Sequence, residues 1–194
     1  MTTKVRMMIA GTALAAMFGL LSMSAPSHAG GKDLKATVMK IADAIKKGDD
    51  AGAKKMAKDA AKGIEDISDL MHLFRPRNKG GLGVGSKTFG TNAAKDGIEV
   101  MLRDFASDVP ANAAKQADAL EETGYWIAAM GEITAAKGWA KDTGKKTKKN
   151  WTNWSDEMRS LGVEFAKAKG GAQLKGAATK VNNNCIACHG VFKE

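Results

Sequence analysis

The residues best suited to chemistry lie together at the C-terminal end of this chain, in the sequence NNNCIACHGVFKE. Cys185 and Cys188 are the only two cysteines, and His189 follows directly. Residues three or four positions apart share a face of a helix, so all three side chains are expected on the inner face of the last helix. A disulfide between the two cysteines would close a very short loop and constrain little of the unfolded chain. We therefore expect a chemical role for these residues instead of a structural cross-link.

Three kinds of site use such residues. A structural zinc ion needs four ligands, and beyond residue 29 the only other cysteine or histidine is the distant His72. Dithiol redox proteins place C-x-x-C at the start of a helix after a strand, and no strand is predicted here. The third is covalent attachment of c-type haem, whose signature is C-x-x-C-H. We therefore expect one haem c, bonded to Cys185 and Cys188, with His189 as the proximal iron ligand.

The N-terminal residues 1–29 have the composition of a secretory signal peptide. Basic Lys4 and Arg6 precede the apolar run MMIAGTALAAMFGLLSM, and small residues suit cleavage after Ala29. An uncleaved membrane anchor is disfavoured because the run is shorter than the ~20 residues of a spanning helix. We expect residues 30–194 to form a single haem-binding domain in the periplasm or otherwise exported, with no membrane span after removal of the signal.

The charge of the chain is basic, with a formal net charge of +9. It falls to +7 without the signal, because Lys4 and Arg6 leave and no acidic residue does. A basic surface favours acidic partners, so we expect an acidic redox partner protein. No pattern of stacking aromatic residues supports nucleic-acid binding. The oligomeric state, monomer or homodimer, stays open.

Apolar residues recur with helical spacing along the whole of residues 30–194. The stripes are Leu34, Val38, Ile41 and Ile45; Met56, Ala60, Ile64, Ile67, Met71 and Phe74; Ile98, Met101, Leu102 and Phe105; Leu120, Ile127, Met130 and Ile133; Trp151, Trp154, Met158, Leu161 and Phe165; and Leu174, Ala178, Val181, Cys185, Cys188 and Phe192. Asp49 and Asp50 suit the start of the second helix. The pattern predicts an all-α fold, an antiparallel bundle of four main helices with an extra short helix and a Gly-rich loop.

Two segments lack this periodicity. RPRNKGGLGVGSKTFGTN holds too many glycines for a regular element, and its GGLGVG has neither the preceding strand nor the Gly-Lys-Ser/Thr of a phosphate-binding loop. Within the Gly-rich loop of residues 80–90, we expect GGLGVG (residues 80–85) to form a solvated turn. The lysine-rich KDTGKKTKKN is expected to be an exposed basic linker.

A helical chain with C-x-x-C-H on its last helix, ending in an aromatic and a basic residue, resembles the class II cytochromes c, which include cytochrome c-prime. The matching residues are Cys185, Cys188, His189, Phe192 and Lys193, and WTNWSDEMRSLGVEFAKA resembles the helix before the haem helix. The resemblance implies a four-helix up-down bundle, with haem c near one end, and either periplasmic electron transfer or gas binding.

Two functions follow from this interpretation. In the first, the protein is a soluble electron carrier whose iron has a sixth ligand. The resemblance implies a methionine on the first helix, which Met39 matches by position; Met71 and His72 are alternatives because they end an apolar stripe beside the unusual loop. In the second, the sixth position is empty and the protein binds nitric oxide or carbon monoxide. An enzyme is not expected, because no acid–base cluster accompanies the haem.

Overall fold

The computed structural model describes residues 31–87 and 95–193, and the predicted signal peptide lies outside them. Its helices are α1 (Gly31–Lys46), α2 (Asp50–Gly63), α3 (Ile67–Met71), η1 (His72–Phe74), η2 (Arg77–Lys79), α4 (Ile98–Ser107), η4 (Ala111–Gln116), α5 (Ala117–Lys137), α6 (Lys148–Lys167) and α7 (Gly171–Phe192). The described residues contain no strand, only an isolated bridge between Thr143 and Lys146. The prediction of an all-α fold is confirmed.

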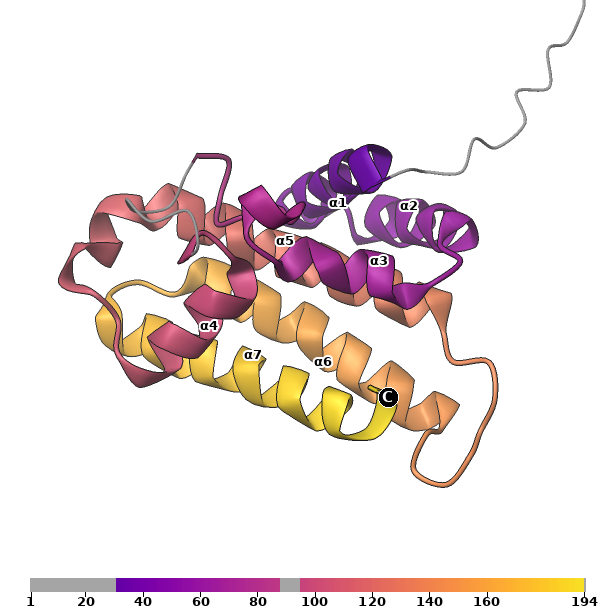
Figure 1. Cartoon of the computed structure of the whole chain (residues 1–194). Coiled ribbons are helices and arrows are strands. Elements are labelled where there is room, and N and C mark those ends of the chain that lie inside the picture. Colours follow the sequence, from indigo (N-terminus) through magenta and orange to yellow (C-terminus); the bar gives the residue numbers. More distant parts are fainter. Residues whose placement is uncertain (1–30, 88–94, 194) are drawn as a thin grey trace, which may run out of the picture.

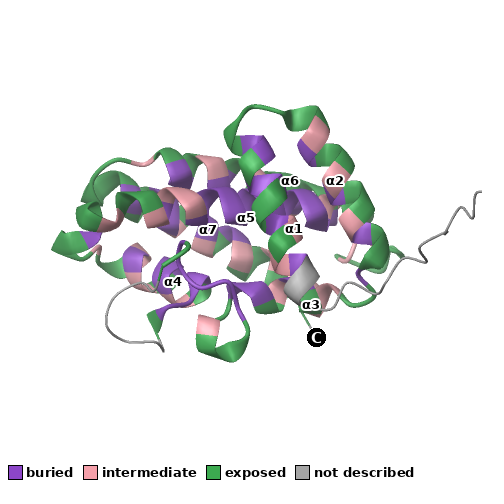
Figure 2. Ribbon diagram, turned by 90° about the horizontal axis from the view of Figure 1, so that it is seen from above, coloured by how far each residue is buried: buried purple, intermediate pink, exposed green. Residues whose placement is uncertain are grey.

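The helix α5 forms the centre of the molecule (Figure 1). It packs against α1 and α2 on one side and against α6 on the other. Every residue from 123 to 134 is buried, so α5 has apolar surroundings on all sides and not along a single stripe. Figure 2 shows the buried residues gathered along this helix. The core therefore forms around α5, with the other helices arranged about it.

Glycines allow α5 and α6 to approach closely. A Cβ atom added at Gly162 would lie 2.5 Å from the backbone nitrogen of Ala128, and one at Gly124 would lie 2.4 Å from that of Ala166. Both positions lie within helices, where glycine is otherwise unfavourable. The close contact between the two helix backbones explains why glycine occupies these positions.

The C-terminal helix α7 packs against α6 and α4, with a smaller contact to η4. Two polar contacts fix the position of α7 along the length of α6. Asn184 Nδ2 donates to Glu157 Oε2 at 2.9 Å, and Lys180 pairs with Glu164 at 2.6 Å. The residue numbers run in opposite senses along the two helices, so the pair is antiparallel. The arrangement holds the last turns of α7 against the first half of α6.

The stripe from Met56 to Phe74 predicts one continuous helix, and this prediction is wrong. The structure divides the segment into α2, α3 and η1. The chain leaves the helix after Gly63, where Ile64 is extended (φ −90°, ψ 110°). It starts again at Asp66, whose side chain accepts a hydrogen bond from Ser68 N at 2.8 Å. A glycine and a capping aspartate thus interrupt an apolar spacing that continues across them.

The buried face of α2 also differs from the expected one. Ala53, Ala57 and Ala61 are buried, whereas Met56 and Ala60 are only half-buried. Small alanine side chains allow α2 to lie close to α1 and α5, so the face with the larger side chains turns partly outward. The expected start of this helix is confirmed, because Asp49 accepts a hydrogen bond from Gly52 N at 2.9 Å.

The solvated turn expected for GGLGVG (residues 80–85) is contradicted, although Gly80 and the following Ser86 and Lys87 are exposed. Residues 81–85 are buried, with Leu82 at 2 % and Val84 at 0 % exposure. The Arg77 guanidinium donates to Gly85 O at 2.8 Å and pairs with the buried Asp96 at 2.8 Å. The two apolar side chains enter the core because an arginine and an aspartate satisfy the polar backbone around them. Positions 88–90 lie outside the described residues.

The other expected elements are close to the observed ones. The first stripe lies on α1 and the third on α4, and Ile98, Met101, Leu102 and Phe105 are all buried. The fourth lies on α5, which the 3₁₀ helix η4 precedes. Within the described ranges, no helix combines the length and the apolar character needed to cross a membrane.

Candidate functional site

The C-x-x-C-H residues occupy the last two turns of α7. Upstream on this helix Leu174, Ala177, Ala178, Val181 and Asn184 are buried. Cys185 and Cys188 are half-buried and free, and Cys185 packs against the core cluster. The two sulfur-bearing residues lie about one helical turn apart on the side of α7 that faces the protein. The structure therefore confirms the inward register of the cysteines, but at the edge of the core.

His189 departs from the expectation that all three side chains meet in the interior, because it is exposed. At 3.6 residues per turn it lies roughly 40° around the helix from Cys185, away from the buried stripe. It also lies in the final turn of α7, where fewer neighbouring elements cover the helix. The imidazole therefore lies at the surface beside the two thiols.

Both thiols are held in the neutral form. Burial raises the pKa of Cys185 to about 11, and the neighbouring Cys188 adds to the increase. Burial likewise raises the pKa of Cys188 to about 11. Redox-active and zinc-binding cysteines need the opposite change, because their reactive form is the thiolate. Among the described side chains, moreover, no group of three or more His, Cys, Asp or Glu residues could hold a metal ion. The raised pKa values of the thiols do not favour a dithiol redox centre, whose reactive form is the thiolate.

These pKa values predict slow alkylation of the thiols in the folded, haem-free chain. Relative to thiols of pKa 9.0, a shift to about 11 lowers the thiolate fraction near pH 8 about 100-fold. Iodoacetamide should therefore react much more slowly in buffer than in urea, and the folded-state rate should rise until above pH 10. A half-maximal rate near pH 9 in the folded chain would contradict this prediction.

The same shifts predict a loss of stability in alkali. The folded chain binds the thiol protons more tightly than the unfolded chain does, because its thiol pKa values are higher. The stability contributed by the neutral thiols is therefore complete below pH 9 and is lost as the pH rises towards 11. Urea denaturation of the haem-free chain across this range, compared with the chain lacking both cysteines, measures this contribution.

The surroundings of His189 keep its ring neutral at pH 7. Although the residue is exposed, partial desolvation of its ring lowers the pKa of His189; Lys193 lowers it further, and Glu99 at the start of α4 opposes the change. In the described part of the chain no side chain forms a hydrogen bond with the ring. A neutral imidazole can offer a nitrogen lone pair to a metal. This state is the one required of an iron ligand.

An aromatic cluster surrounds Phe192 at the C-terminal end of α7, beyond the cysteines. Phe192 lies 4.6 Å from Trp139, 5.0 Å from Trp151 and 5.7 Å from Trp154, measured between ring centroids. Trp151 Nε1 donates to Thr134 O at 2.8 Å, whereas the buried Trp139 Nε1 has no partner among the described atoms. The sequence showed three tryptophans within sixteen positions but not their meeting with Phe192. The cluster is expected to hold the last turn of α7 rigidly.

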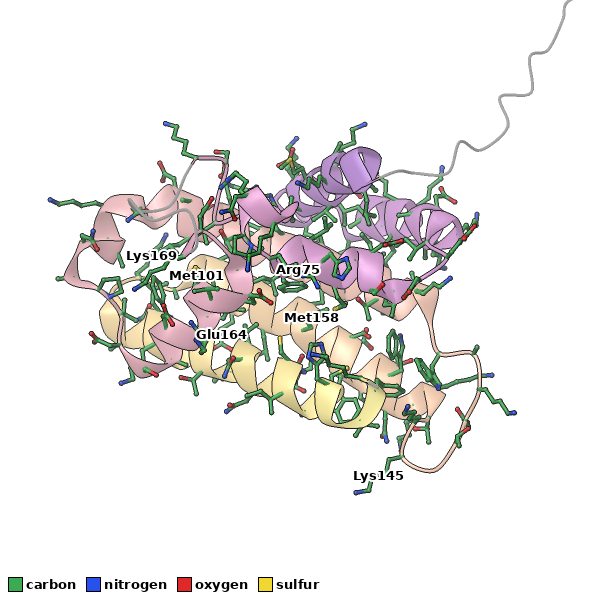
Figure 3. The ribbon with its side chains drawn as sticks, viewed as in Figure 1. Arg75, Met101, Lys145, Met158, Glu164 and Lys169 are labelled. Atoms are coloured by element: carbon green, nitrogen blue, oxygen red, sulfur yellow. The ribbon has the colours of Figure 1, made fainter. Side chains whose placement is uncertain are left out.

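Met158 on α6 is a residue near the motif that sequence analysis treated only as part of a stripe. Met158 and Cys185 directly follow the hydrogen-bonded pair Glu157 and Asn184, so they lie at nearly the same level of the two helices. Met158 is 7 % exposed. Figure 3 shows it on α6, between α3 and the C-terminal half of α7 in that view. It therefore adds an apolar side chain to the core cluster against which Cys185 packs.

The three candidates for a sixth iron ligand lie in different surroundings. Met39 is 37 % exposed on α1, whose main packing partners are α2 and α5. Met71, at the end of α3, packs partly buried on the core, and His72 begins η1 and is exposed. In both ribbon views α3 lies over the C-terminal half of α7 (Figures 1 and 2). The structure therefore brings the α3–η1 segment towards the motif, and leaves Met39 on the other side of α5.

The residues present fit a covalently bound haem. Two free neutral thiols lie about one turn apart on the inward side of a helix, and a neutral imidazole follows them. Met158 and the aromatic cluster supply apolar neighbours, which a porphyrin requires. Protein-family models, curated sequences and solved structures were all compared with the chain, and none matches it.

Proposed function

We propose that this protein is an exported c-type cytochrome, in the periplasm or an equivalent compartment, that carries single electrons through one covalently attached haem c. The observation that carries the proposal is the pair of free, neutral thiols on the inward side of α7, followed directly by an imidazole. Cys185 and Cys188 would hold the haem through thioether bonds, and His189 would bind its iron. When bound, haem supplies a reversible ferric–ferrous couple.

The chain itself would contribute position and surroundings. The hydrogen bond from Asn184 to Glu157 fixes α7 against α6 one residue before the first cysteine, and the contacts of Phe192 fix the helix after His189. Anchored on both sides, the motif keeps its geometry when the iron changes charge. Rigid surroundings favour rapid electron transfer, because little rearrangement accompanies each transfer. We propose no catalytic residues.

The resemblance to class II cytochromes c supports the same function as a proposal. The three longest helices, α5, α6 and α7, are candidates for three members of the expected four-helix bundle. The fourth is α1 or α2, both of which pack on α5. In this proposal α3, α4 and the buried Gly-rich segment are additions to the family's bundle, and α4 covers the side of α7 opposite α6.

A second candidate function is the binding of nitric oxide or carbon monoxide to five-coordinate iron. One observation favours it: Met39, the residue that matches the family's methionine ligand by position, is 37 % exposed and lies on α1, whose main packing partners are α2 and α5. If the protein is an electron carrier, Met71 or His72 would then have to supply the sixth ligand of the iron. These two residues lie on the segment above α7, so the carrier remains our first proposal.

Carbon monoxide distinguishes the two functions. For the carrier, we expect a low-spin ferrous spectrum that carbon monoxide changes slowly or not at all, because a protein side chain holds the sixth position. Replacing Met71 or His72 by alanine should convert that spectrum into one that responds at once, and the residue that does so is the ligand. A high-spin ferrous spectrum in the unaltered protein, with immediate binding, would reject the carrier in favour of the gas-binding protein.

A further inference from the structure

The loop between α5 and α6 carries a strong excess of positive charge. Residues 138–147 contain three lysines, two more lysines follow in the first turn of α6, and the only carboxylate in residues 138–149 is that of Asp142. The Asp142 carboxylate accepts a hydrogen bond from Lys148 N at 2.7 Å, so it serves the start of α6. The helix α2 has a smaller excess, because its four lysines lie in the same segment as Asp50 and Asp59. By sequence, residues 138–149 therefore carry five positive charges and one negative charge, a net charge of +4.

The loop lies directly beside the candidate haem-binding residues. An open pocket of about 500 Å³ is lined by Lys141, Lys145 and Lys146 on the loop and by Gly190 and Val191 on α7. Trp139 and Thr143 complete its lining. Gly190 follows His189 in the chain, so this pocket begins one residue from the candidate iron ligand. Figure 3 shows Lys145 projecting from the loop into solvent.

The aromatic cluster joins the loop to the motif. Trp139, at the start of the loop, packs on Phe192 at 4.6 Å and on Trp151 at 5.1 Å. The tryptophan thus contacts both the last turn of α7 and the first turn of α6. The loop is held at this position although most of its residues are exposed.

We propose that the loop lysines Lys141, Lys145 and Lys146, with the adjoining end of α7, form the docking surface for an acidic face of a redox partner protein. The proposal rests on the proposed function, since it places the partner beside the bound haem. A rim of lysines around Trp139 and Val191 suits a protein surface in which carboxylates surround an apolar spot. A partner docked here would lie next to the end of the haem-binding helix, where the distance for electron transfer is short.

The test compares two triple variants of the haem-loaded protein that change the net charge equally. The first is Lys141→Glu, Lys145→Glu and Lys146→Glu; the control is Lys54→Glu, Lys55→Glu and Lys58→Glu, three exposed lysines of α2. Ferricyanide, an anionic oxidant, is mixed with the ferrous protein at low and high salt. We expect the loop variant to react about tenfold more slowly at low salt and the control to change less than twofold. High salt should remove the difference.

A second measurement does not depend on electron transfer. Deca-glutamate serves as an acidic probe, and its binding to the haem-loaded protein is mapped by amide chemical shifts. The shifts should gather at residues 139–149 and 190–193 and disappear in the loop variant. Phosphatidylglycerol vesicles are used to test whether the loop lysines bind an anionic membrane surface instead of a protein. Binding of these vesicles through the loop, without binding of deca-glutamate, would overturn the proposal. The proposal would also be overturned if ferricyanide oxidised both triple variants equally slowly.

The two proposals fail in different ways. A protein that carries no covalent haem rejects the proposed function before any kinetic comparison is made. A haem-loaded protein in which deca-glutamate shifts residues of α2 instead of the loop rejects the docking surface alone. Circular dichroism and haem content of each variant show that its fold and its loading are retained.

Discussion

Replacing both Cys185 and Cys188 by alanine is expected to abolish covalent haem attachment. The sequence contains no other cysteine, so no thioether bond to the haem can form. Mass spectrometry of acid-denatured protein, produced in a host with c-type maturation, should show one haem on the unaltered chain and none on the variant. Each single replacement should leave at most one thioether bond, and so a less stable product.

The matched control is Ile186→Ser, between the two cysteines. Ile186 is 62 % exposed, so its replacement changes the helix surface and leaves the C-x-x-C-H spacing intact. This variant should carry haem as the unaltered protein does. Covalent haem on the double cysteine variant, or an unaltered chain with the mass of the polypeptide and both thiols free, would show that the cysteines have another role.

Replacement of His189 by alanine is expected to leave haem attached but to change the iron ligation completely. The thiols that hold the cofactor remain, whereas the imidazole that follows them is lost. Axial ligands are a main determinant of the haem potential, so a shift on the order of 100 mV is expected together with changed ferric and ferrous spectra. Added imidazole should restore much of the original spectrum, because the exposed position of His189 leaves room for a free ring.

The other histidine of the described chain provides the comparison for this experiment. His72→Ala removes an exposed ring without altering α7. If His72 is the sixth ligand, its loss should open the iron to carbon monoxide while the proximal bond persists. The proximal role of His189 would be contradicted if its replacement left both the ferric and the ferrous spectra unchanged.

Local features of the sequence predicted most of the helices correctly. The stripes beginning at Leu34, Ile98, Leu120 and Trp151 all lie on observed helices, because their spacing matches the turn of the helix over several repeats. Asp49 was likewise predicted as a helix start, since its carboxylate accepts a hydrogen bond from the backbone only three residues away. Interactions over such short separations can be recognised from the order of the residues.

The errors arose where distant contacts compete with local pattern. The spacing from Met56 to Phe74 continues across Gly63 and Asp66, but the chain breaks there so that α2 and α3 can pack separately. The Gly-rich segment appeared solvated because glycines and basic residues dominate it. Leu82 and Val84 are nevertheless buried, because Arg77 and Asp96, nineteen positions apart, satisfy the polar groups around them.

For the candidate site, the motif can be recognised from the order of the residues: Cys185, Cys188 and His189 share one region of a helix because helical geometry places residues three and four positions apart on neighbouring turns. Which elements surround these residues depends on tertiary packing. The fold packs α4 and α6 against α7, places Met39 on α1, and brings Trp139 and Phe192 together. The exposure of His189 also depends on packing, since a helical stripe predicts the direction of a side chain but not where the neighbouring helices end.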